Sequence, residues 1–307
     1  KAYLKQPYDT ARFFNKLCDM YRQLRQCDSV DYLPDHKGNV RPSFKKKTQV
    51  LRQKHRRNIL SGGKFFLSKK NYALAYPFFD LYCSYKEESK KKEQSDSLYS
   101  NAALWATLSA FLSENYSGTI KYADEAIGYL DSARAAVLQE YKVRSYAKLD
   151  NDSAWVATLK QGIVSFPQHD YFFVQLADWY HSQRNYKEER ALADKLIART
   201  GGKAIHYYAK SKSYLAEDNF NACITYADST IALAEDFADA YYNKGIAYLN
   251  MAVISQEMAC KDVKNPQYTA DKQKTQILYR EARPCMEMVR RLQPDKQERW
   301  ASPLYRI

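Results

Sequence analysis

A period of 34 residues in the placement of aromatic side chains constrains the fold of this chain more than any other sequence feature. One register of the period holds Tyr146, Tyr180, Tyr214 and Tyr248, and a second holds Phe173, Tyr207 and Tyr241. In a third register an asparagine precedes an aromatic residue, at Asn71-Tyr72, Asn115-Tyr116, Asn185-Tyr186 and Asn219-Phe220. Three registers that share one period indicate a chain built from repeated structural units.

The apolar residues inside each unit have helical spacing. Phe173, Leu176 and Tyr180 fall at i, i+3 and i+7, which places them on one face of a helix. After a short polar turn, a second apolar stripe includes Tyr186 and Leu196. Each unit is therefore predicted to be a pair of antiparallel helices of about 12–15 residues, neither of which buries its stripe alone.

These units resemble the tetratricopeptide repeat (TPR), a helix–turn–helix repeat with small or aromatic residues at fixed positions. The small eighth position matches Gly63, Ala177, Ser211 and Gly245; the aromatic eleventh matches Phe66, Tyr146, Tyr180, Tyr214 and Tyr248; the closing proline matches Pro167 and Pro294. The twentieth position, usually Ala, is Ala75 and Ala282 but Trp155 and Glu189 elsewhere, which weakens the expected packing of the middle units. The resemblance implies an all-α fold, a right-handed superhelix of antiparallel helix pairs (a TPR-like α-solenoid).

The repeat frame also predicts how the chain is divided. The array covers residues 56–294, with units that begin near 56, 100, 136, 170, 204 and 238. Ten extra residues after the first unit are assigned to a polar loop at 87–97, and about 25 in the last unit to a lengthened hairpin that turns at Asn265-Pro266. Residues 1–55 are predicted to hold N-terminal helices and a basic segment, and residues 295–307 the start of a capping helix, with truncation of that helix as an open alternative.

Three further prolines give local predictions. Pro77 and Pro284 each stand two residues after the alanine of the twentieth position, and we expect them in the first turn of a second helix. Ser302-Pro303 is typical of an N-cap and the first helical position, so the capping helix is expected to begin there.

The positive charge of the chain is concentrated in one segment. Lys and Arg number 48 against 35 Asp and Glu, for a formal net charge of +13. The 44 residues between Asp35 and Asp80 contain no carboxylate and hold twelve of these cations, so the rest of the chain is nearly balanced. Within this segment we expect a basic docking surface for an acidic partner or an anionic surface, formed by Lys45, Lys46, Lys47, Arg52, Lys54, Arg56 and Arg57.

No catalytic or metal-binding motif is present in the sequence. The five histidines form no HExxH pattern and the six cysteines no CxxC pair, so neither a metal nor another cofactor is expected. Gly62-Gly63 and Gly201-Gly202 lack the strand-to-helix context of a phosphate loop; the first pair suggests close helix packing and the second a helix end. We therefore predict a protein that is not an enzyme.

The resemblance implies instead a binding groove lined by the first helix of each unit. Carried onto this sequence, the groove positions of the family give Tyr141, Arg144, Tyr171, Gln175, Asp178, His181, Tyr208, Lys212, Tyr242 and Asn243. Tyrosines with mixed polar groups suit a peptide or protein segment, so the main hypothesis is a scaffold or adaptor for protein interactions.

Two other functions stay open: a sensor or regulatory module of a larger protein, and an anion or nucleic-acid binder that uses residues 37–70. Nucleic acid is the weaker choice, because Phe44 is the only aromatic residue among residues 37–64 and gives no stacking platform. The first residue is Lys1 and not Met, and similar bacterial TPR proteins are often exported, so an exported or periplasmic location is expected alongside a cytoplasmic one.

Overall fold

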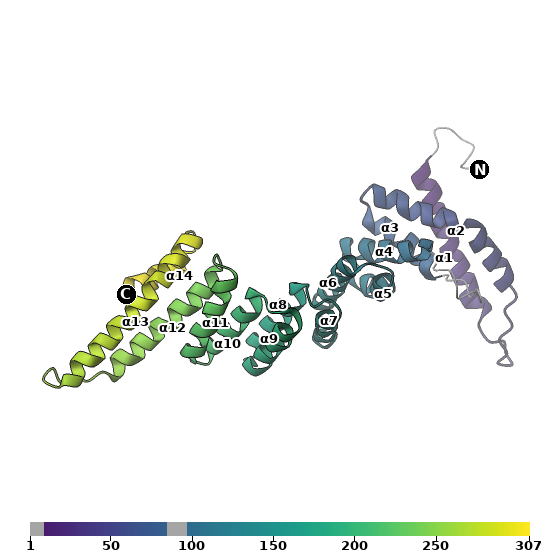
Figure 1. Cartoon of the computed structure of the whole chain (residues 1–307). Helices are drawn as coiled ribbons and strands as arrows, with labels where there is room; N and C mark the ends of the chain where they lie inside the picture. Colours follow the sequence, from purple (N-terminus) through teal and green to yellow (C-terminus); the bar gives the residue numbers. More distant parts are fainter. Residues whose placement is uncertain (1–8, 85–96) are drawn as a thin grey trace. The chain divides into compact units, whose positions relative to one another are not determined.

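The computed structural model describes residues 9–84 and 97–307, which contain fourteen α-helices and no strand (Figure 1). The chain separates into two compact units, Lys1–Thr158 and Leu159–Ile307, and the boundary falls inside α7. The first seven helices are α1 (Thr10–Asp31), α2 (Lys45–Ser68), α3 (Tyr72–Ser84), α4 (Ser97–Leu112), α5 (Tyr116–Ile127), α6 (Ser132–Lys148) and α7 (Asp152–Ser165). They are followed by α8 (Asp170–Ser182), α9 (Tyr186–Thr200), α10 (Ala204–Ala216), α11 (Phe220–Leu233), α12 (Ala238–Met258), α13 (Pro266–Leu292) and α14 (Gln297–Arg306).

One turn recurs between paired helices and explains the asparagine register. The backbone N–H of the asparagine donates to a carbonyl five residues earlier at 2.8–3.1 Å, and its side-chain Oδ1 accepts from the N–H three residues later at 3.0–3.4 Å. The asparagine thus closes one helix and caps the next. The turn occurs at Asn71, Asn115, Asn151, Asn185 and Asn219.

Close approach of paired helices explains the small residues of the repeat. A Cβ added at Gly62 would lie 2.7 Å from the ring of Phe78, and one at Gly63 would lie 2.6 Å from the ring of Phe79. Because neither ring has room to give way in a packed core, only glycine allows α2 and α3 to meet this closely. The glycine pair is therefore a packing feature, as its sequence context suggested.

A lysine–aspartate pair recurs between one helix pair and the next. Lys142 Nζ lies 2.7 Å from Asp124 Oδ1, and the same contact measures 2.6 Å both for Lys210 with Asp194 and for Lys244 with Asp228. Lys210 and Lys244 are one period apart, as are their partners Asp194 and Asp228. Each pair joins the second helix of one unit to the first helix of the next, so these contacts help to fix how neighbouring units stack.

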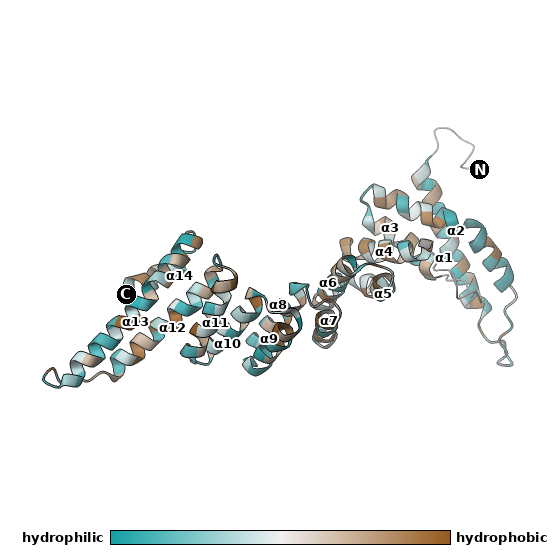
Figure 2. Cartoon of the chain, viewed as in Figure 1, coloured by the Kyte–Doolittle hydropathy of each residue, from teal (hydrophilic) through white to brown (hydrophobic). Residues whose placement is uncertain are grey.

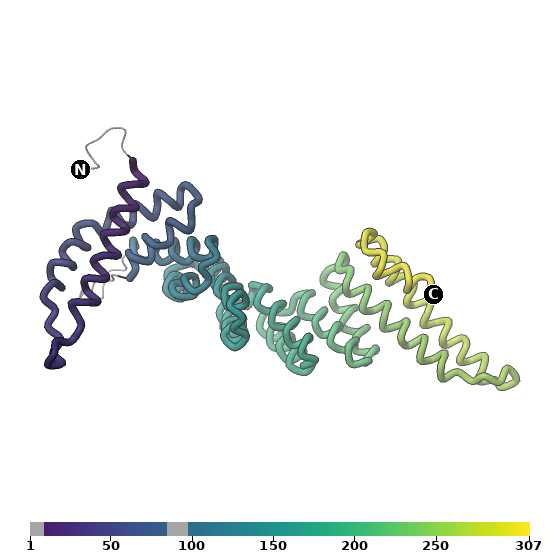
Figure 3. The backbone as a smooth tube through the Cα atoms, turned by 180° about the vertical axis from the view of Figure 1, so that it is seen from behind, coloured from purple at the N-terminus to yellow at the C-terminus, as the bar shows by residue number. Residues whose placement is uncertain are grey.

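The last pair of helices is the longest in the second unit. α12 has 21 residues and α13 has 27, and the two run antiparallel side by side (Figure 3). α13 begins at Pro266, with Asn265 as its cap. The short helix α14 then packs against both through Trp300, Leu304 and Ile307, which surround a core of Leu249, Ala282, Met286 and Val289.

The three proline predictions are wrong in their placement. Pro77 is the sixth residue of α3 and Pro284 lies deep in α13, because these helices begin earlier than expected, at Tyr72 and Pro266. Each proline therefore removes a helical N–H from the interior of its helix. Pro303 likewise lies inside α14, which begins at Gln297 and not at Ser302-Pro303, since Trp300 needs the earlier turn to reach the core.

Apart from Ser97, the polar loop expected at 87–97 lies outside the described residues.

Candidate functional site

The first helices of three consecutive pairs lie next to one another in the second unit. α8 contacts α10, and α10 contacts α12. Along this side of the unit lie partly exposed or exposed side chains that we call the first-helix face: Tyr171, Gln175, Asp178, Tyr208, Lys212, Asp239 and Tyr242, with Arg299 from α14.

Two ion pairs, each between side chains of different helices, lie on the first-helix face. Lys212 Nζ on α10 donates to Asp178 Oδ1 on α8 at 2.8 Å, and these residues occupy the same position in successive repeats. Arg299 Nη1 donates to Asp239 Oδ1 at 2.5 Å and to Gln293 Oε1 at 2.6 Å. The face therefore carries both signs of charge.

Tyr208 lies at the centre of this face. Its ring centroid is 5.0 Å from that of Phe237, and its pKa is raised first by burial and then by the charge of Asp239, with Arg299 opposing and Asp178 adding to the shift. The hydroxyl is therefore protonated at neutral pH, and it forms no hydrogen bond with the described residues. It is available as a hydrogen-bond donor and acceptor.

Arg299 is a member of the face that the sequence did not predict. Its guanidinium carbon lies 4.3 Å from the ring centroid of Tyr242, a cation–π geometry. The residue belongs to α14 and is 60 positions from Asp239, its ion-pair partner. An ion pair between residues so far apart in the sequence cannot be predicted from local spacing. The sequence indicated only that a capping helix lies at the C-terminal end.

Two of the predicted groove residues are used inside the fold. Asn243 is buried, and its Nδ2 lies 3.5 Å from Ser211 Oγ, so it packs between α10 and α12 and faces no ligand. His181 is partly exposed, but its Nδ1 lies 2.9 Å from Oε2 of the buried Glu189. This contact also explains the glutamate at a position where alanine is usual, because His181 provides the polar partner that a buried carboxylate needs.

The two predicted groove residues of the first unit each contact a different neighbour. The ring of Tyr141 stacks on that of Phe111, with centroids 4.1 Å apart and an interplanar angle of 6°. Arg144 is exposed and pairs with Glu140 one turn earlier on α6.

The predicted basic surface is divided between packed and exposed cations. Arg52 pairs with Asp28 and donates to the Leu24 carbonyl at 2.9 Å, and the guanidinium of Arg56 lies 4.5 Å from the ring centroid of Tyr82. These two arginines hold α2 against its neighbours and do not belong to an open surface. The remaining five members are exposed: Lys45, Lys46, Lys47, Lys54 and Arg57.

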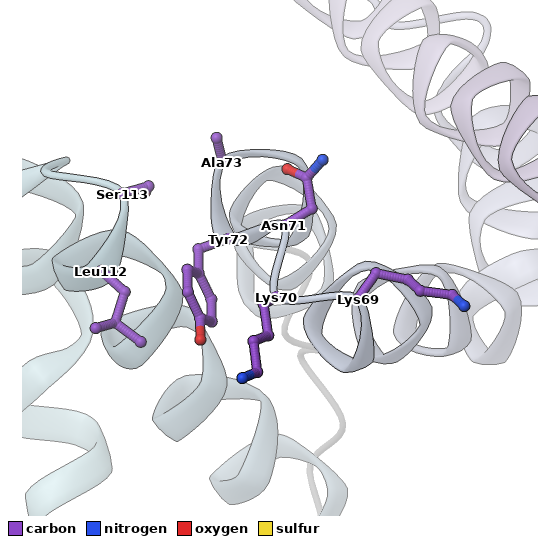
Figure 4. Close-up of a pocket in the computed structure, with 7 residues that line it drawn as sticks. All are labelled: Lys69, Lys70, Asn71, Tyr72, Ala73, Leu112 and Ser113. Atoms are coloured by element: carbon purple, nitrogen blue, oxygen red, sulfur yellow. The ribbon is translucent and has the colours of Figure 1, made fainter.

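A shallow pocket of about 430 Å³ lies in the first unit, between the α2–α3 turn and the end of α4 (Figure 4). Its lining consists of Lys69, Lys70, Asn71, Tyr72, Ala73, Leu112 and Ser113. In the close-up, the Lys70 ammonium and the Tyr72 hydroxyl point toward the same side. The lining holds no carboxylate, histidine or cysteine, the side chains that most often bind metal ions in proteins.

Groups capable of covalent or metal chemistry are scattered or buried. Within residues 9–84 and 97–307, no three His, Cys, Asp or Glu side chains gather as a metal site would need. All six cysteines are free, and burial raises the pKa of Cys285 to about 11 and that of Cys83 to about 12. At neutral pH these two thiols are therefore protonated and weak as nucleophiles.

Helix pairs that recur with a 34-residue period and meet through one repeated turn define an all-α, TPR-like fold, as the sequence resemblance implied. No protein-family model matches the chain, and no curated protein matches it.

Solved structures similar to this chain include bacterial TPR proteins. One is a TPR repeats protein from Bacteroides fragilis, 17% identical with a TM-score of 0.39, over 82% of this chain and 99% of the other. A tetratricopeptide repeat protein from Parabacteroides merdae is 11% identical with a TM-score of 0.43, over 82% and 98% of the two chains. The C-terminal part of a TPR repeat-containing protein from Cytophaga hutchinsonii is 12% identical with a TM-score of 0.44, over 80% and 99%.

Proposed function

We propose that this chain is a non-enzymatic scaffold that binds a peptide or protein segment of a partner across the first-helix face of the second unit. One observation carries the proposal. The amide of Gln175 and the hydroxyls of Tyr208 and Tyr242, on three successive first helices, form no hydrogen bond with the described residues. A row of polar groups without internal partners is what an extended peptide backbone needs for its own N–H and C=O groups.

The charges beside this row support the same function. The Asp178–Lys212 pair and the Asp239–Arg299 pair flank Tyr208, so the face offers both signs of charge within reach of one ligand. Such mixed charge favours selection of partners by side-chain complementarity more than by net charge. The half-buried rings of Tyr208 and Tyr242 add apolar contact area with little loss of side-chain freedom.

The experiment is a selection of random peptides displayed on phage against the whole chain, followed by affinity measurements on the selected peptides. The double variant Gln175→Ala/Tyr208→Ala removes two of the three free polar groups and one ring. We expect it to weaken binding at least about ten-fold, the size of effect typical of a central interface residue. Melting temperature measured alongside tests that the variant is folded.

Tyr305→Ala is the matched control, since it removes a tyrosine that is 94% exposed on α14. We expect it to bind the selected peptides as the unchanged chain does. Selected peptides that bind the double variant and the unchanged chain equally would exclude the first-helix face as the binding surface.

A further inference from the structure

The end of the α1–α2 hairpin combines exposed apolar side chains with unbalanced positive charge. We call residues 28–57 the hairpin tip; it includes the end of α1, the connecting loop and the first half of α2. Nine Lys and Arg lie within it against three Asp. Figure 2 shows hydrophobic residues interspersed among hydrophilic ones along α2.

All three carboxylates of the hairpin tip are committed to its internal structure. Asp31 accepts the backbone N–H groups of Ser43 and Phe44, each at 2.8 Å, and so caps the start of α2 from the end of α1. Asp28 accepts from Thr48 Oγ1 at 2.7 Å and pairs with Arg52. Asp35 accepts two N–H groups in the loop at 2.9 Å, and these hydrogen bonds lower its pKa. The carboxylates therefore fix the conformation of the loop.

Large apolar side chains stand in solvent between the cations. Val30 is 66% exposed, Val50 64% and Phe44 50%, and Leu33 and Val40 are similarly exposed. Lys46, Val50 and Lys54 follow one another at i, i+4 and i+8 on one side of α2. Lys47 Nζ lies 5.6 Å from the ring centroid of Phe44. Five large apolar side chains exposed within one basic segment form the kind of patch that marks a protein or membrane contact.

We propose that the hairpin tip docks on an anionic lipid bilayer, with its lysines at the headgroups and Phe44, Val50 and their apolar neighbours in the boundary of the hydrocarbon. Stable attachment to a membrane surface takes two weak signals together, and the tip holds both: buried apolar area and a basic cluster. Each Lys or Arg near an anionic surface contributes about 1 kcal/mol. Among residues 9–84 and 97–307, every helix is too short or too polar to span a bilayer.

The exposed apolar residues favour an anionic bilayer over a nucleic acid or an acidic protein as the binding partner. Phosphates of a nucleic acid, or carboxylates of an acidic protein, would pair with the lysines but gain little from an exposed Val30, Val40 or Val50. A bilayer, by contrast, has a place for both kinds of side chain: anionic headgroups for the lysines and hydrocarbon for the apolar residues. The test therefore has to separate the contribution of charge from that of apolar area.

The experiment measures sedimentation of the whole chain with phosphatidylcholine vesicles that do or do not contain phosphatidylglycerol, at low and high ionic strength. We expect binding only where phosphatidylglycerol is present, and release as salt is raised. Lys46→Gln/Lys47→Gln/Lys54→Gln should weaken partition by at least ten-fold, given about five-fold for each lysine. Phe44→Ser/Val50→Ser, which keeps every charge, should also weaken it by at least ten-fold.

Lys160→Gln/Lys187→Gln/Lys195→Gln is the matched control, because it removes three exposed lysines from the second unit. We expect it to sediment as the unchanged chain does, and we expect all variants to keep the unchanged melting temperature. No binding to phosphatidylglycerol vesicles at low salt would overturn the proposal. The proposal would also be overturned if the second-unit lysine variant lost as much vesicle binding as the hairpin-tip variants. Retention of binding by Phe44→Ser/Val50→Ser, together with equally tight binding to polyglutamate, would mean that the tip recognises acidic polymers and not a bilayer.

Discussion

Five turns of the array place a residue with a full side chain in the left-handed region of backbone conformation. The residues are Lys70, Glu114, Asp150, Arg184 and Asp218, with φ between 51° and 60°. Glycine usually takes this position at a helix end, because a Cβ there crowds the following carbonyl. Because these turns lack glycine, the only sequence sign of each turn is the asparagine that follows the left-handed residue. Asn151 was missed altogether because Asp152, and not an aromatic residue, comes after it.

A first prediction concerns this strain. Arg184→Gly should raise the free energy of unfolding by roughly 0.5–1 kcal/mol, because glycine adopts a positive φ without the crowding that a side chain meets. Urea unfolding followed by circular dichroism measures the change. Gln183→Gly is the control, since Gln183 has φ of −81° and glycine there should bring no gain. Equal or lower stability of Arg184→Gly would contradict the argument.

The asparagine caps give a second prediction. Asn219→Ala removes the side-chain oxygen that accepts from the Ala222 N–H at 3.3 Å, and should lower the free energy of unfolding by about 1 kcal/mol. Asn219→Asp keeps an acceptor and should cost less. If urea unfolding shows the two variants to be equally unstable, the cap does not stabilise α11.

A third prediction concerns pH. His206 is fully buried, its Nδ1 accepts from the Lys203 N–H at 3.2 Å, and burial lowers its pKa from the usual 6.5, with Lys203 adding and Asp170 opposing. Below pH 6.5 the unfolded chain gains a proton that the folded chain resists, so stability should fall as pH falls.

His206→Phe tests this argument, because Phe172 occupies the same position one repeat earlier and the ring has a precedent in the fold. Urea unfolding at pH 7.5 and at pH 5.5, values chosen about one unit on either side of the usual histidine pKa, should show a smaller loss of stability in His206→Phe than in the unchanged chain. Parallel losses would assign the pH dependence to other groups.

Among the elements, α14 shows most clearly what sequence reasoning reached and what it missed. A capping helix was expected, but its start was placed at Ser302-Pro303, six residues too late, because serine before proline is a strong local signal. Tertiary packing sets an earlier start: Trp300 and Leu304 pack against the core that contains Met286 and Val289, and the helix begins at Gln297. Local signals predicted the helix, and tertiary contacts set its bounds.

A fourth prediction follows for α14. Trp300→Ala should remove the main apolar contact of this ten-residue helix, which is too short to be stable alone. Hydrogen exchange at residues 297–306 should then become faster, while α8 and α9 keep their protection. Unchanged exchange in α14 would mean that the ion pair of Arg299 with Asp239 is enough to hold it.

For the whole molecule, periodicity in the sequence was sufficient to predict an all-α chain of repeated helix pairs. Register, by contrast, determines which side chains are available to a ligand: of the groove positions that the family frame gives, Asp178 is exposed and Asn243 is buried. Asn243 is buried between α10 and α12, where its side-chain amide donates a hydrogen bond to the hydroxyl of Ser211 in the preceding repeat. Repeated positions predict packing well, whereas the binding surface depends on contacts between repeats.

The central claim is that a partner segment binds the first-helix face of the second unit. The most direct measurement places a photo-crosslinking amino acid at position 208, and in a second protein at position 305, and irradiates each with a peptide selected by the unchanged chain. The account predicts a covalent adduct from position 208 and none from position 305. An adduct from position 305 with none from position 208 would contradict it.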